Sequence, residues 1–240
     1  MKKHIPNIIT LFNLLSGLIA LIFVFDRNWI WAAFWVASGI FFDFFDGLFA
    51  RKLSVSSQLG LQLDSLADMV TSGVVPAFAM FFLLQDASQI DVLHNFEWNT
   101  KYLLPFAGLL IALASALRLA KFNIDERQST SFIGLPTPAN ALFVMSLPLI
   151  IYHSSYIVLA KFFFNPTSLI LVTLILSWLL NAEIPLFSLK FKDFSWQNNR
   201  EKYILITTSI IAVFVLQWAA LPAVIVFYIF LSVLFNRKKL

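Results

Sequence analysis

The chain has 240 residues, of which 60% are hydrophobic and 12% are charged. A soluble domain carries about 25% charged residues, so the composition excludes an ordinary soluble domain and predicts a polytopic membrane protein. The sequence contains no cysteine, which excludes disulfides and cysteine-ligated zinc.

Eight apolar segments are predicted to form membrane-spanning helices, since a helix needs about 20 residues to cross ~30 Å of hydrocarbon. We retain the first as a span because its apolar run is too long for a signal peptide. The fifth contains Pro138 and Pro148, which favour a kink or an irregular backbone. The predicted spans cover residues 6–26, 29–50, 60–85, 102–121, 137–153, 165–182, 202–218 and 220–236.

The loop charges predict the orientation of these spans, because Lys and Arg concentrate in cytoplasmic loops. With a cytoplasmic N-terminus, only Arg27, Lys101 and Lys161 of the 17 basic residues fall outside. Both termini then lie in the cytoplasm. The net charge of +4 is thereby explained by topology, and we expect no nucleic-acid partner. The basic residues expected inside are Lys2, Lys3, Arg51, Lys52, Arg118, Lys121, Arg127, Lys190, Lys192, Arg200, Lys202, Arg237, Lys238 and Lys239.

A polar stretch from Lys190 to Lys202 carries interleaved aromatic residues and divides the last two spans from the rest. We therefore expect an all-α protein with a six-helix catalytic membrane domain at residues 1–185. Residues 186–240 are expected to form an interfacial segment and a C-terminal helix pair.

Two pairs of aspartates interrupt the second and third spans. Asp43 and Asp46 are three residues apart and share a helix face with the small residues Gly47 and Ala50. Small residues let a ligand or another backbone approach closely.

Asp64 and Asp68 are four residues apart and share a face at the start of the third span. A short cytoplasmic connection makes the two spans antiparallel neighbours, so we expect all four carboxylates to meet. Four such charges need compensation, which two Mg²⁺ or Mn²⁺ ions would supply through oxygen ligands. A two-metal site suits displacement at phosphorus. Arg51, just beyond the acidic face, is placed to hold a phosphate oxygen.

Two other interpretations of the aspartates remain. Single aspartates at helix ends are often solvated caps, but two pairs on adjacent helices argue against capping. Intramembrane carboxylates also line the ion paths of cation transporters. Such a path needs polar residues through to the far side of the membrane, and the second and third spans offer few.

The pattern Asp43-x2-Asp46-Gly47-x2-Ala50-Arg51-x8-Gly60-x3-Asp64-x3-Asp68 resembles the signature of the CDP-alcohol phosphotransferase family of membrane enzymes at every fixed position. Other segments are similar to the phosphatidylserine synthase branch of that family. They are Ile5–Gly17, Asp64–Ala77, Ala116–Asn123 and Phe132–Ala139.

The resemblance implies transfer of the phosphatidyl group of CDP-diacylglycerol to L-serine, with release of CMP. The motif itself does not encode the acceptor, so glycerol phosphate, inositol phosphate or a choline-type alcohol remain alternatives. The resemblance further implies a homodimer. The loop charges place the active site on the cytoplasmic side, and we expect the protein to be surrounded by the lipids of a prokaryotic cytoplasmic membrane.

Roles for the signature residues also follow from the resemblance. Asp43, Asp46 and Asp64 match metal ligands, and Asp68 matches a residue that binds metal and acts as general base. The matching contacts to the CDP-lipid fall on Gly47, Ala50, Arg51 and Gly60.

Further polar residues near the cytoplasmic ends of spans are weaker candidates. Asn7 and Thr10 are placed to contact the nucleotide, or else to form a cap or a bond between helices. Arg118, Lys121 and Asn123 are placed to bind the carboxylate of serine or the lipid phosphate, or else to anchor the helix at the interface.

The segment Gly134–Pro138 either walls the acceptor pocket or serves as a simple turn. The sequence does not separate these two roles.

Overall fold

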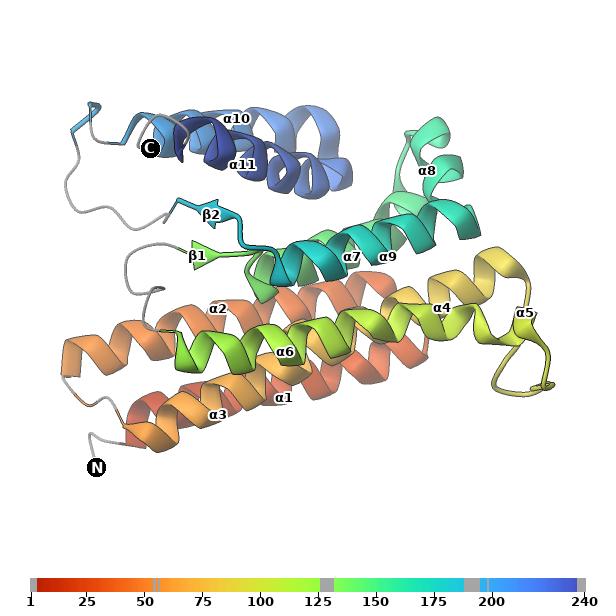
Figure 1. Cartoon of the computed structure of the whole chain (residues 1–240), viewed down its shortest axis with the longest axis horizontal. Coiled ribbons are helices and arrows are strands. Elements are labelled where there is room, and N and C mark those ends of the chain that lie inside the picture. The colour runs from red at the N-terminus through yellow and green to blue at the C-terminus, as the bar shows by residue number, and fades with distance from the viewer. Residues whose placement is uncertain are drawn as a thin grey trace.

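The computed structural model describes residues 4–53, 55, 57–125, 132–187, 195–197 and 199–236. The described residues form three stacked layers of helices (Figure 1). The first holds α1 (Ile5–Phe25), α2 (Trp29–Leu53), α3 (Gln58–Asp68), α4 (Val75–Ser88) and α6 (Leu110–Ile124). The second holds α7 (Thr137–His153) and α9 (Pro166–Asn181), and the third holds α10 (Arg200–Leu216) and α11 (Ala220–Asn236).

Each of the eight predicted spans is helical. Among the described residues, five helical runs are long and apolar enough to cross a membrane. The pair α8 (Ile157–Phe163) and α9, bent by 74°, makes a sixth if it counts as one span. The chain is therefore an all-α polytopic membrane protein. The count of eight spans stays a prediction. With 17 residues, α7 is shorter than the about 20 residues that a span needs. The run Arg200–Phe235 was found as one candidate but contains two helices that pack together.

The third span is not a uniform α-helix. Between α3 and α4 the backbone forms a π-helical turn, η2 (Met69–Val74), and Pro76 is the second residue of the α-helix that follows. Proline lacks the N–H that continues the α-helical ladder, and π-turns are frequent at functional sites. The irregular backbone that was expected for the fifth span is not found, because α7 is one continuous α-helix with Pro138 in its first turn. A kink at Pro148, which lies inside the helix, stays a prediction.

The hydrophobic core surrounds α4, from which residues Val75 to Leu84 face inward with almost no exposed surface, except for half-buried Phe78. Many large apolar side chains of the outer helices are exposed, among them Ile22, Phe34 and Phe44. In a membrane protein these side chains contact lipid.

A small strand pair was not predicted. β1 (Phe132–Ile133) and β2 (Pro185–Leu186) are antiparallel and lie between α6 and the third layer (Figure 1). The turn after β1 is fixed by Gly134, whose φ of 74° is a left-handed conformation. Short one-turn and 3₁₀ elements complete the described helices: α5 (Thr100–Leu103), η3 (Pro105–Leu109) and η5 (Gln217–Ala219).

Candidate active site

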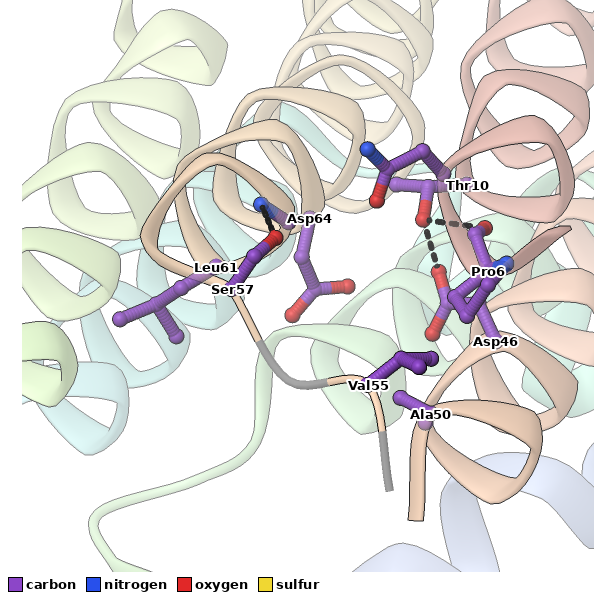
Figure 2. A pocket seen from close by; sticks show the side chains of 11 residues that line it. Pro6, Thr10, Asp46, Ala50, Val55, Ser57, Leu61 and Asp64 are labelled. Carbon is purple, nitrogen blue, oxygen red and sulfur yellow. Dashed lines mark hydrogen bonds between the residues drawn. The ribbon is translucent and has the colours of Figure 1, made fainter. Parts of the chain in front are cut away.

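Carboxylates from α2 and α3 meet where these two helices adjoin the connecting segment. Asp43, Asp46 and Asp64 each place one carboxylate oxygen within 4.8 Å of the others. Figure 2 shows Asp64 and Asp46 on opposite sides of the same cavity. Asp68 is not part of this group of three. It lies one helical turn further along α3 and is 9% exposed.

The first helix supplies hydrogen-bond donors to two of the aspartates. Thr10 Oγ1 donates to Asp46 Oδ2 at 2.6 Å and also lies 3.1 Å from the Pro6 carbonyl oxygen (Figure 2). Asn13 Nδ2 donates to Asp68 Oδ1 at 3.1 Å. Thr71 Oγ1 in turn donates to the Asn13 carbonyl oxygen at 3.0 Å, which ties α1 to the π-turn. These bonds fix the positions of both carboxylates.

The carboxylates lack cationic partners in the described part of the chain. Among those residues, no Lys, Arg or His nitrogen lies within 4.0 Å of the four aspartates. Asp64 Oδ1 is buried and has no hydrogen-bond partner among the described residues. A buried ionised carboxylate is unfavourable unless it is paired, coordinates a metal or takes up a proton. The donor set of closely spaced carboxylate oxygens therefore fits hard divalent cations such as Mg²⁺ or Mn²⁺.

A cavity of about 180 Å³ opens beside these carboxylates. It brings together seven of the residues predicted as metal or CDP-lipid contacts. Arg51 does not line it but approaches Gly47, where an added Cβ would lie 3.5 Å from Arg51 Nη1. That is an ordinary contact, so packing within the described chain does not require glycine at this position. The cavity is lined by Pro6, Asn7, Thr10, Asp46, Gly47, Ala50, Val55, Ser57, Gly60, Leu61 and Asp64.

Gly60 has a packing role as well. An added Cβ would lie 3.2 Å from both Asn7 Oδ1 and Ser57 Oγ, which is a tight contact. The Gly60 N–H donates to Ser57 Oγ at 3.0 Å, so Ser57 caps the start of α3.

Two of the three predicted acceptor residues line one cavity, and the third does not. Arg118 is 6% exposed and is close enough to Asp68 for electrostatic interaction. With Lys121 it lines a second, smaller cavity at the ends of α6 and α9. Asn123 is not among the residues lining that cavity, and its Nδ2 donates to Ser65 Oγ of α3 at 2.9 Å.

The segment Gly134–Pro138 packs against the end of α9. Leu135 N donates to the Leu179 carbonyl oxygen at 2.9 Å, and an added Cβ on Gly134 would lie 2.6 Å from the Leu180 carbonyl oxygen. The left-handed backbone and the lack of space for a side chain therefore explain why residue 134 is glycine. Ile133, just before it, lines the second cavity.

Sequence reasoning missed several residues of the site. Asn13 is the most informative, since it is fully buried and contacts Asp68. Its three-residue spacing from Thr10 within an apolar span was an available signal. Ser57 carried a local signal as well, since serine is a preferred residue at the start of a helix. Ser65 had no comparable signal, because its partner Asn123 lies 58 residues away in the chain.

The fold and the site define a membrane-embedded all-α protein with an aspartate-lined cavity. A model of the CDP-alcohol phosphatidyltransferase family matches residues 3–182. The chain belongs to this family.

Curated relatives have serine-specific names. A protein of Bacillus subtilis (strain 168) named CDP-diacylglycerol--serine O-phosphatidyltransferase is 34% identical over 186 residues, covering 76% of this chain and 89% of the relative. A protein of the same name from Helicobacter pylori (strain J99) is 28% identical and covers 98% of this chain and 95% of the relative. An archaetidylserine synthase of Methanothermobacter thermautotrophicus is 28% identical over 152 residues, covering 62% of this chain and 60% of the relative.

Proposed function

We propose that the chain transfers the phosphatidyl group of CDP-diacylglycerol to the hydroxyl of L-serine, giving phosphatidylserine and CMP. The observation that carries the proposal is the group of Asp43, Asp46 and Asp64, which belong to the family signature and gather beside a cavity without cationic partners. The names of the curated relatives support serine as the acceptor.

Asp43, Asp46 and Asp64, together with Asp68, are proposed to hold two divalent cations, Mg²⁺ or Mn²⁺. When bound, such ions stabilise the negative charge that builds up on the pyrophosphate. The unpartnered Asp64 Oδ1 and the 4.8 Å grouping of carboxylate oxygens support this assignment.

Asp68 is proposed as the general base. Its Oδ1 accepts from Asn13, and no described residue donates to its Oδ2, which leaves that oxygen for the proton of the serine hydroxyl. The serine oxygen then bonds to the phosphorus that carries diacylglycerol. The bond from that phosphorus to the bridging oxygen breaks, and CMP leaves with the oxygen.

The larger cavity is proposed to receive the CDP-lipid. Gly47 and Ala50 leave room for the nucleotide and pyrophosphate, and Arg51 approaches from the next turn of α2 to hold a phosphate oxygen. Asn7 and Gly60 also line the cavity. Thr10 orients Asp46 through its hydrogen bond and so acts on the same site.

Arg118 is proposed to bind the carboxylate of serine, assisted by Lys121. In the described chain its guanidinium forms no hydrogen bond or ion pair and lies 5.6 Å from the Phe122 ring centre. A buried guanidinium without a partner favours an anionic ligand. A serine contact for Asn123 stays a prediction, although its amide already bonds to Ser65.

We further infer that both termini and the active site face the cytoplasm of a prokaryotic cell. The beginning of α1 and the end of α11 lie toward the same end of the molecule as the adjoining ends of α2 and α3 (Figure 1), which supports this topology. Several of the basic residues used for the orientation lie outside the described residues. They are Lys2, Lys3, Arg127, Lys190, Lys192 and Arg237 to Lys239.

The division into residues 1–185 and 186–240 is also a proposal. A small core of Leu186, Leu205, Tyr228 and Leu231 supports a separate helix pair. A homodimer is inferred from the family resemblance alone.

A cation transporter is disfavoured by the third span. Beyond the π-turn, the inward-facing residues of α4 are buried and apolar as far as Leu84, which leaves no polar path along this helix. Carboxylates confined to one end of a span suit a catalytic site better than a transport path.

The test is an acceptor panel. The purified protein is given CDP-diacylglycerol, Mg²⁺ or Mn²⁺, and one alcohol at a time, and CMP release is measured. L-serine is expected to support release, whereas glycerol phosphate, inositol phosphate and choline are not. Release with glycerol phosphate alone would remove the serine assignment. Divalent-cation flux in liposomes without CMP release would favour a transporter.

A further inference from the structure

The π-turn η2 carries a threonine that packs between α1 and α2. Thr71 is fully buried and lines neither of the two polar cavities described above. The turn is π-helical because Val75 N donates to the Val70 carbonyl oxygen, five residues earlier, instead of to a partner four residues earlier. Such turns are rare and occur frequently at functional sites, so the side chain that this one presents to α1 and α2 is a candidate for a role in the reaction.

Two glycines form a socket for the Thr71 side chain. A Cβ added to Gly17 of α1 would collide with Thr71 Oγ1 and would lie 3.0 Å from Thr71 Cα. A Cβ added to Gly39 of α2 would lie 2.6 Å from Thr71 Cγ2. The hydroxyl therefore faces one glycine and the methyl group faces the other, and neither helix has room for a larger residue. Small residues allow this close approach between helices within a membrane.

The socket also contains the residue that holds Asp68. Asn13, one helical turn before Gly17, is fully buried, and an added Cβ on Gly39 would lie 2.9 Å from its Oδ1. Asn13 Nδ2 donates to Asp68 Oδ1 at 3.1 Å, and the Asn13 carbonyl oxygen accepts from Thr71 Oγ1 at 3.0 Å. Thr71 thus fixes the backbone of Asn13, and Gly39 confines its side chain.

We infer that Thr71 is a positioning residue for the proposed base. Seated between Gly17 and Gly39, its hydroxyl holds the backbone of Asn13, so that the Asn13 amide stays aligned on Asp68. The orientation of the base is therefore set from the π-turn through α1. This inference rests on the proposed function and adds to it a residue outside the aspartate signature that acts on the base without contacting substrate.

The test compares variants by steady-state CMP release with L-serine as the acceptor. Thr71→Val keeps the branched shape and removes the hydroxyl, whereas Thr71→Ser keeps the hydroxyl and removes the methyl group. Thr173→Val in α9 is the matched control. Thr173 is also fully buried, and its Oγ1 also donates to a backbone carbonyl oxygen, that of Leu169, at 2.8 Å.

Thr71→Val is expected to lower kcat about tenfold, the lower end for a residue that orients a partner of a metal site, and to leave the KM values for CDP-diacylglycerol and L-serine unchanged. Thr71→Ser should keep most of the kcat, because the hydroxyl is retained. Thr173→Val should change none of these values. A packing role would give the opposite order, since Thr71→Ser empties part of the socket and Thr71→Val fills it.

The route through Asn13 is tested by a double-mutant cycle. If Thr71 acts by aligning Asn13, then Thr71→Val causes no further loss of kcat in the Asn13→Ala background, since the amide that it positions is gone. Independent roles would instead multiply the two losses.

Four results would each overturn the inference while the serine reaction stood. They are an unaltered kcat in Thr71→Val, an equal or larger loss in Thr71→Ser, a rise in KM in place of a fall in kcat, and multiplied losses in the double variant. Absence of serine-dependent CMP release from the unaltered protein would instead overturn the proposed function. Thermal unfolding shows whether each variant is folded. If Thr71→Val is not, Thr71→Ala, which adds no atom to the socket, carries the same prediction.

Discussion

Carboxylates occur inside the helical bundle at two places, and their surroundings differ. Near the end of α4, Asp86 pairs with Arg27 at 3.0 Å and accepts from Tyr152 OH at 3.1 Å. The Arg27 guanidinium also lies 4.0 Å above the Phe82 ring. At the other end of the same span, Asp64 has no cation within ion-pair distance among the described residues.

This difference separates a structural carboxylate from a candidate catalytic one. Asp86 is half-buried and has a counter-charge in Arg27, so its role is complete without a ligand. Asp43, Asp46 and Asp64 have no such counter-charge among the described residues. The comparison predicts that substitutions at one end affect stability and those at the other affect catalysis.

The largest effect is expected for Asp68→Asn, which keeps the shape of the side chain and removes the base. Turnover should fall about 10²- to 10⁴-fold, the usual contribution of a general base. Binding of CDP-diacylglycerol, measured by equilibrium titration, should be largely retained. Loss of binding equal to the loss of rate would argue that Asp68 is chiefly a metal ligand.

A smaller loss is expected for Asn13→Ala. Without the Asn13 amide, Asp68 loses the donor that holds Oδ1, and kcat should fall about 10- to 100-fold, as for partners of metal-site residues. Ser16→Ala is the matched control, because Ser16 is also buried in α1 but bonds only to the Phe12 carbonyl oxygen. Equal kcat values in the two variants would contradict the positioning role.

The two ends of the third span can be compared in thermal unfolding with and without Mg²⁺ or Mn²⁺. Asp86→Asn weakens a partly exposed ion pair, so the melting temperature should fall by about 2–4 °C, or ~1 kcal/mol. The variant should keep the stabilisation by metal that the unaltered protein shows.

Asp64→Asn should show the opposite pattern. The metal-dependent rise in melting temperature should vanish, because a ligand of the proposed site is lost. A full metal response in Asp64→Asn, or its loss in Asp86→Asn, would break the distinction between the two ends.

The smallest effect is expected for Gly47→Ala. The added methyl group fits the described chain, so the melting temperature should not change. It enters the cavity and should raise the KM for CDP-diacylglycerol about five- to tenfold, the lower end of the effect of a methylene in a binding pocket. Gly108→Ala is the contrast, since its Cβ would lie 2.5 Å from Phe81 N in the core. It should lower the melting temperature instead. The reverse outcome would contradict the assignment of Gly47 to the donor site.

Much of the fold was predictable because helix and span length leave a strong local signal. The apolar runs and the spacing of each aspartate pair were sufficient to place the carboxylates at adjoining helix ends. The separation of Asp68 from the other three was not predictable, since it depends on how α1 and α6 approach α3.

The acceptor side was less accessible from the sequence. Arg118 and Asn123 are one and a half turns apart on α6, and only packing decides that Arg118 reaches the second cavity while Asn123 reaches Ser65. Asn181 and Glu183 come from the end of α9, more than fifty residues later in the chain. Local spacing carries no information about such pairs.

The central claim is tested most directly by the stoichiometry of one reaction. The purified protein is incubated with CDP-diacylglycerol, radiolabelled L-serine and Mg²⁺ or Mn²⁺, and both CMP and labelled lipid are measured. We predict one labelled phosphatidylserine for each CMP released, and neither product in Asp68→Asn above the residual rate. CMP release without labelled lipid, or labelled lipid formed equally well by Asp68→Asn, would contradict the account.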